Sequence, residues 1–262
     1  MPTSSVPDAL REFALVPDRY TRLGGDATRS DDGRICVVQG NTWAAISGLR
    51  LGPDEVEAAL GEVRALVPAE KTQTWWLDAD ATPADLYERL VALGLQRPAD
   101  GGDVVHALVC TDEPATGPAG VSVRTVETFD EHLAATELQW ELFETPRDRR
   151  EAQKPHLRSE FEAARAAGSP VTFLASIDGR PVGVARSVYS DRGVFLIAGA
   201  VLPPYRGRGV YRALVRARWE DAVQRQTPAL VTEALADTSY PILAGFGFVD
   251  VGTTRRLEDR RR

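Results

Sequence analysis

One stretch near the C-terminus limits what this chain can fold into more than any other. The apolar residues 194–201 predict a buried strand, which two prolines end at once. A short loop with Gly207 and Gly209 follows, and then a helix begins. The first turn of a helix has unpaired backbone N–H groups and the positive end of the helix dipole, so this junction suits an anion. Glycine has no Cβ and lets a phosphate approach the backbone closely, and we therefore predict a diphosphate site.

The order of residues in this loop is more specific than its glycine content. The loop lacks the G-x-x-x-x-G-K-[ST] and G-x-G-x-x-G patterns of other phosphate sites. It reads V-x-P-x-x-R-x-x-G from Val201 to Gly209. In this it resembles the GNAT superfamily of acyl-CoA-dependent N-acyltransferases, whose loop pattern is [QR]-x-x-G-x-[GA]. Arg206 and Gly209 match the first two fixed positions, whereas Tyr211 stands where small residues prevail. The alternative is an ordinary strand, turn and helix whose glycines serve only the turn.

The elements expected after residue 120 follow the order of the GNAT fold. Alternating and apolar runs predict strands, and longer periodic runs predict helices. We expect strands at 121–126, 171–177, 181–189, 194–201 and 229–235 with a last one from Phe246, and helices at 129–143, 147–167, 209–226 and 239–244. The resemblance covers 120–255 and implies a GNAT acetyltransferase domain at 121–262.

The N-terminal part repeats much of this order. Residues 111–120 have the composition of a linker. Before them we expect strands at 34–38, 42–46, 72–77 and 104–110, and helices at 51–66 and 83–93. The segment 92–95 also echoes the Gly-Phe motif at 245–248. We interpret residues 1–110 as a degenerate GNAT-like domain produced by internal duplication. An unrelated small α+β domain is the alternative.

The fold class expected is thus α+β, with two GNAT-like repeats that each form a mixed, mostly antiparallel sheet flanked by helices. In the N-terminal repeat, Asp54 and Glu55 stand where the phosphate loop meets its helix. Carboxylates suit that end of a helix but repel a diphosphate. We therefore expect the N-terminal repeat to bind no CoA.

Composition excludes several classes of partner. A net charge of −7 argues against a protein that binds nucleic acid through phosphate contacts. No apolar run is long enough to span a membrane, and no signal peptide is evident, so we expect a cytoplasmic protein without a membrane partner. Cys36 and Cys110 are expected to be buried free thiols, and the three histidines lie in separate elements, so no metal site is expected. We expect the basic tail from Arg255 to be a solvated, frayed end.

The resemblance also implies which residues bind the cosubstrate, acetyl-CoA. The diphosphate would lie on the loop, and the pantetheine arm would follow the end of the preceding strand. In family members an amine attacks the thioester directly, and a strand amide, here near Val201, stabilises the oxyanion. The cofactor-binding residues implied are Gly199, Ala200, Val201, Arg206, Gly207, Arg208, Gly209, Val210, Tyr211 and Arg212.

The catalytic residues depart from the family's usual positions. Many members use a carboxylate on the strand before the loop as the general base, but residues 194–201 contain no carboxylate. Many others use a tyrosine as the general acid that protonates the thiolate, four residues before the Gly-Phe pair. Counted back from Gly247-Phe248, this position holds Leu243. We therefore predict Glu233 as the base and Tyr240, one helical turn earlier, as the acid. The alternative for Glu233 is an exposed or hydrogen-bonded strand residue, and the alternative for Tyr240 is a structural tyrosine at the helix entry.

The sequence gives less information about the acceptor than about the cosubstrate. Glu137, Glu141 and Glu144 share one helix face and are predicted to bind a cationic amine, the alternative being a solvated face. The function expected is an acetyl-CoA-dependent N-acetyltransferase that acts on a small-molecule or peptide amine. A non-catalytic, regulatory acyl-CoA-binding module is the alternative. The oligomeric state and the identity of the acceptor stay open.

Overall fold

The apolar alternation of the sequence builds one continuous sheet with helices on both faces. The computed structural model describes residues 6–25, 27–99 and 101–261. Its helices are α1 (Asp8–Leu15), α2 (Pro17–Tyr20), α3 (Val56–Leu66), α4 (Leu86–Ala92), α5 (Phe129–Leu142), α6 (Arg147–Gln153), α7 (Leu157–Ala167), α8 (Val210–Gln224) and α9 (Ser239–Ala244). Its strands are β1 (Thr28–Asp31), β2 (Cys36–Gln39), β3 (Trp43–Ser47), β4 (Thr72–Leu77), β5 (Val104–Cys110), β6 (Val121–Thr125), β7 (Val171–Ile177), β8 (Arg180–Ser190), β9 (Gly193–Val201), β10 (Leu230–Leu235) and β11 (Val249–Asp259).

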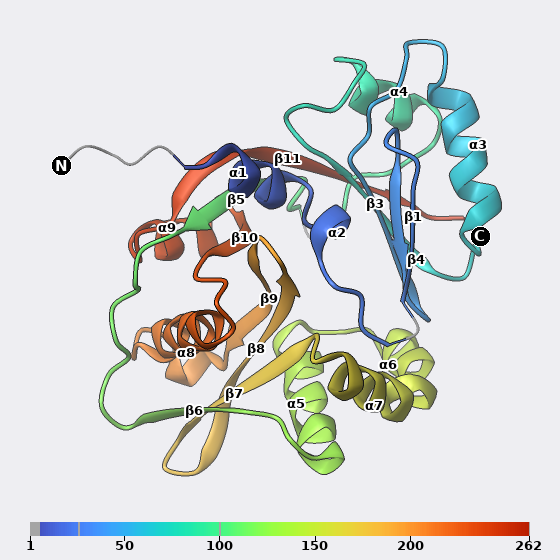
Figure 1. The fold of residues 1–262 in the computed structure, drawn as a ribbon. Helices are drawn as coiled ribbons and strands as arrows, with labels where there is room; N and C mark the ends of the chain where they lie inside the picture. The colour runs from blue at the N-terminus through green and yellow to red at the C-terminus, as the bar shows by residue number, and fades with distance from the viewer. Residues whose placement is uncertain (1–5, 26, 100, 262) are drawn as a thin grey trace.

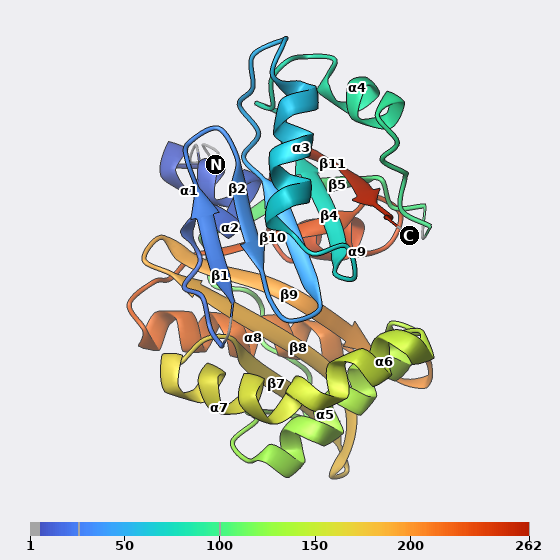
Figure 2. The same ribbon diagram turned by 90° about the vertical axis from the view of Figure 1, so that its right-hand side faces the viewer.

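The strands lie in the order β1-β2-β3-β4-β11-β5-β10-β9-β8-β7-β6. All neighbours are antiparallel except β3 with β4 and β9 with β10. The expected fold class, a mixed and mostly antiparallel sheet flanked by helices, is therefore confirmed. Figures 1 and 2 show that the two ends of the sheet form two halves, β1–β4 with α3 and α4 in one and β6–β10 with α5 to α8 in the other.

The last strand of each half pairs inside the other half. β5 follows β4 in the sequence, yet it pairs with β10 along its whole length, from Leu230 opposite Cys110 to Leu235 opposite Val105. β11 ends the C-terminal half, yet it pairs with β4 and carries Leu257 into the apolar core of the N-terminal half. Figure 1 shows β11 crossing from one half to the other. The two halves are therefore joined by an exchange of strands as well as by the linker.

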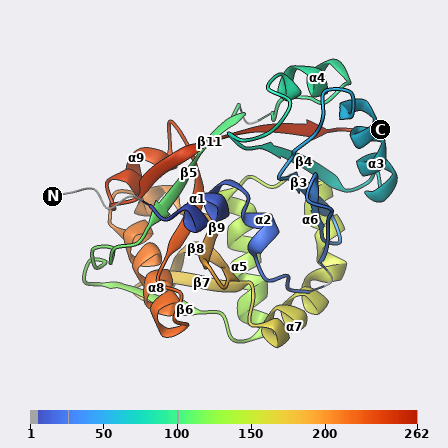
Figure 3. The same ribbon diagram turned by 45° about the horizontal axis from the view of Figure 1, so that its top comes forward.

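The two faces of the C-terminal half are covered differently. One face of β9 and β10 packs on α8 through Leu196, Leu230, Val215 and Trp219. On the opposite face α1 lies over β5 and β10, where Phe13 packs against Ala107, Val109 and Val231, and α5 packs on β7 and β8. Figure 3 shows α1 and α2 between the two halves. This second face is only partly covered, and it forms the floor of the site described below.

Local sequence signals account for several element ends. Thr128 and Glu131 form a capping box that begins α5, with Glu131 N donating to Thr128 Oγ1 at 3.3 Å. Gly168 ends α7 in the left-handed conformation that glycine adopts without strain. Cys36 and Cys110 are buried free thiols, as expected.

Two expectations about the chain ends need correction. The sequence predicts no element before residue 34, yet Asp8–Leu15, Pro17–Tyr20 and Thr28–Asp31 form α1, α2 and β1. The basic tail is not a frayed end, since β11 continues to Asp259 and pairs with β4. Arg255 lies over the ring of Tyr87 at 3.2 Å, and Arg64 pairs with the carboxylate of Asp259 at 2.9 Å. Long-range strand pairing therefore immobilises a charged segment that local composition assigns to solvent.

Candidate active site

The site begins where two parallel strands separate. β9 and β10 pair at only three positions, which end with Leu196 opposite Thr232. Beyond this point β9 continues to Val201 without pairing to β10. Backbone groups that face such a gap are available to a ligand. The strand that precedes the glycine-rich loop therefore has an open edge along the segment predicted to bind pantetheine.

A bulge in β9 lies at the same place. Val184 of β8 pairs with Ala200 and Arg186 pairs with Ile197, so Ala198 and Gly199 both lie opposite one residue of β8. Ala198 adopts a φ of +51°, which is unfavourable for a residue with a Cβ. A bulge releases backbone groups from the ladder and bends the strand. It frees the backbone next to the strand opening.

The glycine-rich loop presents unpartnered N–H groups. Within the described ranges, none of the backbone N–H groups of residues 207–212 donates to another protein group. Gly207 and Gly209 adopt φ values of +71° and +75°, and a Cβ placed on Gly207 would meet no atom within 4 Å. Arg206 is held by a hydrogen bond from its Nε to the carbonyl oxygen of Val201 at 3.1 Å. The loop thus combines donors, cations and open space, which fits a diphosphate.

The corresponding loop in the N-terminal half is closed by its own carboxylate. There Gly52 N donates to Glu55 Oε2 at 2.6 Å. The same carboxylate group pairs with Arg34 at 3.6 Å. An amide that the C-terminal loop leaves open is therefore occupied in the N-terminal loop, and this arrangement supports the prediction that the N-terminal half binds no CoA.

A large cavity lies between the two halves. Its volume is about 1250 Å³, and it reaches the opening between β9 and β10 at Ile197, Ala198 and Gly199. The N-terminal half contributes Ser47 and Trp76 to its wall, while α5 contributes Trp140. A cleft at a junction between domains is a common place for a small-molecule site.

Glu233 faces this cavity from β10. Burial raises the pKa of its carboxyl to about 8, with a further rise from the negative charge of Asp18 and an opposing effect of Arg256. A carboxyl with a pKa near neutrality is suited to proton transfer. The structure thus places the predicted base in the cavity, and its catalytic role stays a prediction.

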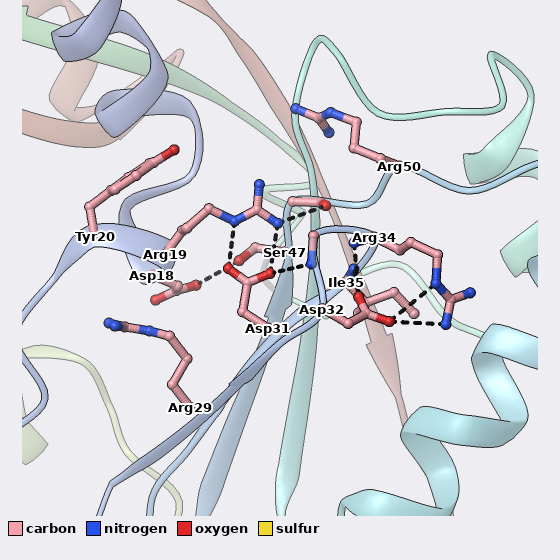
Figure 4. Close-up of polar contacts among 12 residues, drawn as sticks. Asp18, Arg19, Tyr20, Arg29, Asp31, Asp32, Arg34, Ile35, Ser47 and Arg50 are labelled. Atoms are coloured by element: carbon pink, nitrogen blue, oxygen red, sulfur yellow. Dashed lines mark hydrogen bonds and ion pairs between the residues drawn. The ribbon is translucent and has the colours of Figure 1, made fainter.

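Asp18 is a second carboxyl in the same cavity, half-buried and contributed by α2 of the N-terminal half. Burial raises its pKa to about 6, against the opposing effects of a hydrogen bond from Ser47 and the charge of Arg29. Figure 4 shows Asp18 with Ser47, whose Oγ donates to Oδ2 of Asp18 at 3.3 Å. Two carboxyls from opposite halves of the chain therefore face one space.

The two candidate tyrosines lie in different surroundings. Tyr240 packs on His106 of β5, with ring centroids 4.3 Å apart, and lies outside the cavity lining. Tyr211 lines the cavity, and a Cβ on Gly199 would lie 2.9 Å from its ring and 3.4 Å from its hydroxyl. The same Cβ would lie 3.6 Å from the buried guanidinium of Arg218. Tyr211 is therefore the tyrosine whose hydroxyl lies beside the strand opening.

The predicted substrate-binding glutamates lie elsewhere. Glu137, Glu141 and Glu144 are exposed and do not line the cavity. The cavity residues of the same segment are Gln139, Trp140, which is buried, and Phe143, which is 49% exposed. The role predicted for the three glutamates stays untested, and the carboxylates that face the cavity come from other elements.

The polar cavity residues that the sequence did not identify as site residues include Asp18, His132 and Arg186. Asp18 belongs to a four-residue helix without a motif, so no local signal identified it. Arg186 interrupts the apolar run Val182–Val188. A charged residue inside an apolar strand is a sequence signal of function or of charge pairing.

Comparison with known proteins decides the family. Residues 133–241 match the acetyltransferase (GNAT) family. The chain carries a GNAT-family acetyltransferase domain. This confirms the resemblance seen in the loop and identifies the C-terminal half as that of a GNAT-type acyltransferase. Enzymes of this family transfer an acyl group from acyl-CoA. A search of curated protein sequences finds no match.

Solved structures extend the similarity of fold beyond the GNAT domain. A GCN5-related N-acetyltransferase from Kribbella flavida is 19% identical, with a TM-score of 0.65 and coverage of 98% of both chains. One from Sphaerobacter thermophilus is 20% identical, with a TM-score of 0.57, over 98% of this chain and 86% of its own. A tandem GNAT protein from the clavulanic acid biosynthesis pathway is 15% identical, with a TM-score of 0.58, over 98% of this chain and 89% of its own. This last similarity supports the tandem arrangement.

Two further features concern the described ranges alone. They contain no group of three or more His, Cys, Asp or Glu side chains arranged to hold a metal ion. None of their helices is both long enough and apolar enough to cross a membrane.

Proposed function

We propose that this chain transfers an acetyl group from acetyl-CoA to the nitrogen of a small-molecule or peptide amine. The observation that carries the proposal is the separation of β9 from β10 directly before a loop of unpartnered N–H groups, with the cavity behind the opening. A ligand with an anionic end and a linear arm fits this arrangement. Acetyl-CoA supplies the activated acyl group as a thioester.

The loop residues Arg206–Arg212 bind the diphosphate in this proposal. Their N–H groups and the first turn of α8 donate to it, and Arg208 and Arg212 add positive charge. Gly199, Ala200 and Val201 present their backbone to the pantetheine arm. The N–H groups freed at the bulge stabilise the oxyanion that forms when the amine attacks the carbonyl carbon.

Two side chains move the protons. The carboxylate of Glu233 accepts a proton from the attacking amine, helped by the negative charge of Asp18 close by. The tetrahedral oxyanion then collapses with cleavage of the C–S bond, and the departing thiolate needs a proton. We assign this proton to the Tyr211 hydroxyl, because it lies beside Gly199. Tyr240 remains the alternative donor predicted from the sequence.

Calorimetric titration of the full chain with acetyl-CoA, combined with thiol release over a panel of amines, tests the proposal. Binding followed by thiol release supports an acetyltransferase. Binding without release on any amine favours the regulatory acyl-CoA-binding module. An absence of binding overturns the assignment of the loop Arg206–Arg212 and with it the proposed function.

A further inference from the structure

Three residues on adjacent strands, Arg186, Ile197 and Glu233, form a row across the cavity floor. The row has a basic residue at one end and an acidic residue at the other. Arg186 of β8 pairs with Ile197 of β9, and Glu233 of β10 lies one position beyond the last β9–β10 pair, Leu196 with Thr232. All three row members line the cavity. Neighbouring paired strands lie about 4.8 Å apart, so the backbone of Ile197 lies at about this distance from that of Arg186. Glu233 lies on the other side of Ile197, just beyond the point where β9 and β10 separate.

Arg186 has no partner for its charge. No described residue forms a hydrogen bond or an ion pair with its side chain, and its Nε is buried. Glu160 of α7 is the carboxylate that faces it, but it lies beyond ion-pair distance, and its Oε1 accepts a hydrogen bond from Asn41 at 3.3 Å. A half-buried guanidinium whose Nε is enclosed without a partner is costly, and an arginine stays charged. An anionic ligand bound at this corner of the cavity would therefore be stabilised by the charge of Arg186.

His132 of α5 adds a second unpartnered group to the same corner. Its Nε2 is buried and has no hydrogen-bond partner among the described residues. Burial and the charge of Arg186 lower its pKa to about 4, so the ring is neutral at neutral pH. A neutral imidazole can donate one hydrogen bond from Nε2. A ligand oxygen that reaches both side chains would satisfy two groups that the protein leaves open.

We propose that the acceptor carries a carboxylate as well as its amine, and that Arg186 and His132 bind this carboxylate while the amine lies at Glu233 and Asp18. The acceptor class is thus an amino acid or a comparably small amino-carboxylate. This inference rests on the proposed function.

The charges around Arg186 favour a carboxylate over a phosphate. A guanidinium binds the two oxygens of a carboxylate side by side. A single negative charge balances the charge of Arg186, whereas the second charge of a phosphate would lie close to Glu160, the carboxylate that faces Arg186.

Matched acceptor pairs test the proposal. Thiol release is measured with amino acids and with their carboxamides, which keep the amine and lose the charge. For the unmodified chain we expect kcat/KM to be at least about tenfold higher for the acids, which corresponds to about 1.4 kcal/mol. Arg186→Met should raise KM for the acids about tenfold or more and leave the carboxamides unchanged, the pattern expected when binding alone is lost. Arg186→Lys should restore part of the preference.

Two controls separate a specific effect from a general one. Arg147→Met removes the same charge from the exposed face of α6 and should change neither kinetic constant. Thermal unfolding should show that Arg186→Met is at least as stable as the unmodified chain, because its side chain has no partner to lose. Acids and carboxamides that react equally well, or that are impaired equally by Arg186→Met, would overturn the proposal.

A binding measurement distinguishes this inference from the proposed function. N-acetyl amino acids and their carboxamides, which resemble the two products, are titrated into the full chain and into Arg186→Met. Preferential binding of the acids that disappears in the variant supports the carboxylate site even where no turnover is seen. Equal binding, or none by either compound, overturns the carboxylate site. A lack of thiol release from bound acetyl-CoA counts against the proposed function alone.

Discussion

Asp18 and Glu233 face one cavity from opposite halves of the chain, and the negative charge of Asp18 raises the pKa of Glu233. Asp18 comes from the short helix α2, and Glu233 comes from the strand beside the opening in the sheet. The N-terminal half therefore contributes a group that tunes the proposed base in the C-terminal half. This relationship gives that half a role in the site without any binding of CoA.

The pH dependence of activity should follow Glu233. Turnover should rise with pH as the carboxyl, whose pKa is about 8, loses its proton. Glu233→Gln should lower kcat about 100-fold, a typical contribution of acid–base catalysis. The loss should be largest below the acceptor's own pKa, because above it the amine is already neutral. Asp18→Asn should move the rise in activity to lower pH, since it removes a negative charge. A pH–rate series on the three proteins measures both effects.

Stability should depend on the same group, with a defined sign. The carboxyl of Glu233 has a pKa of about 8 in the folded chain and 4.5 as its ordinary value, so between these pH values the folded chain holds the extra proton. Its contribution to stability therefore falls as pH rises through this window. Glu233→Gln should flatten that part of the curve of melting temperature against pH. Asp54→Asn, an exposed carboxylate, is the control, and an unchanged curve in Glu233→Gln would contradict the assigned pKa.

The two loop glycines should respond differently to alanine. Both have positive φ, so each substitution carries similar backbone strain, about 1 kcal/mol. At Gly207 the new methyl group meets open space, where the diphosphate is proposed to lie. At Gly209 it would lie 2.8 Å from the ring of Pro118. Both variants should lose acetyl-CoA affinity by about tenfold or more, whereas Gly209→Ala should also lower the melting temperature further.

A bulkier substitution gives the sharper test of this loop. Gly209→Leu should abolish acetyl-CoA binding in calorimetry. Gly179→Ala in the β7–β8 turn has a similar φ of +76° and open space, so it reports backbone strain away from the loop. An unaltered affinity of Gly209→Leu for acetyl-CoA would show that the loop does not bind the diphosphate.

Two phenylalanine variants should identify the proton donor. Tyr211→Phe keeps the ring that packs on Phe246, with centroids 6.3 Å apart, and removes only the hydroxyl. We expect it to lower kcat about 100-fold at unchanged acetyl-CoA affinity. Tyr240→Phe should keep its contact with His106 and leave kcat unchanged. The opposite pattern would return the role to Tyr240, and two fully active variants would mean that neither tyrosine supplies the proton.

The exchanged strand should be essential to the N-terminal core. Leu257 of β11 is fully buried there, so Leu257→Ala should lower the free energy of unfolding by about 3 kcal/mol. Val249 begins the same strand and is 50% exposed, so Val249→Ala should change it by less than about 0.5 kcal/mol. Chemical denaturation measures both. Equal effects of the two substitutions would contradict the pairing of β11 with the N-terminal half.

Local patterns were sufficient for most elements and for the cosubstrate loop. The strands at Thr72–Leu77, Val104–Cys110 and Val171–Ile177 lie where alternation predicts them. A strand, a proline stop and a glycine-rich turn are encoded by consecutive residues, so the loop before α8 could be recognised from sequence, and it lies within the residues that match the family. The helix α1 and strand β1 were missed, because their packing depends on partners far along the chain.

The amino-acid sequence by itself determined the order of most elements and the presence of a GNAT domain, and it predicts the position of the phosphate loop, since these depend on periodicity and on short runs of residues. Only the tertiary structure decided that β5 and β11 change places, because many strand pairings satisfy the same alternation. It also decided that Asp18, Arg186 and Glu233 share one cavity. These residues are far apart in sequence, and burial between the two halves, not local propensity, brings their charges together and alters their pKa values.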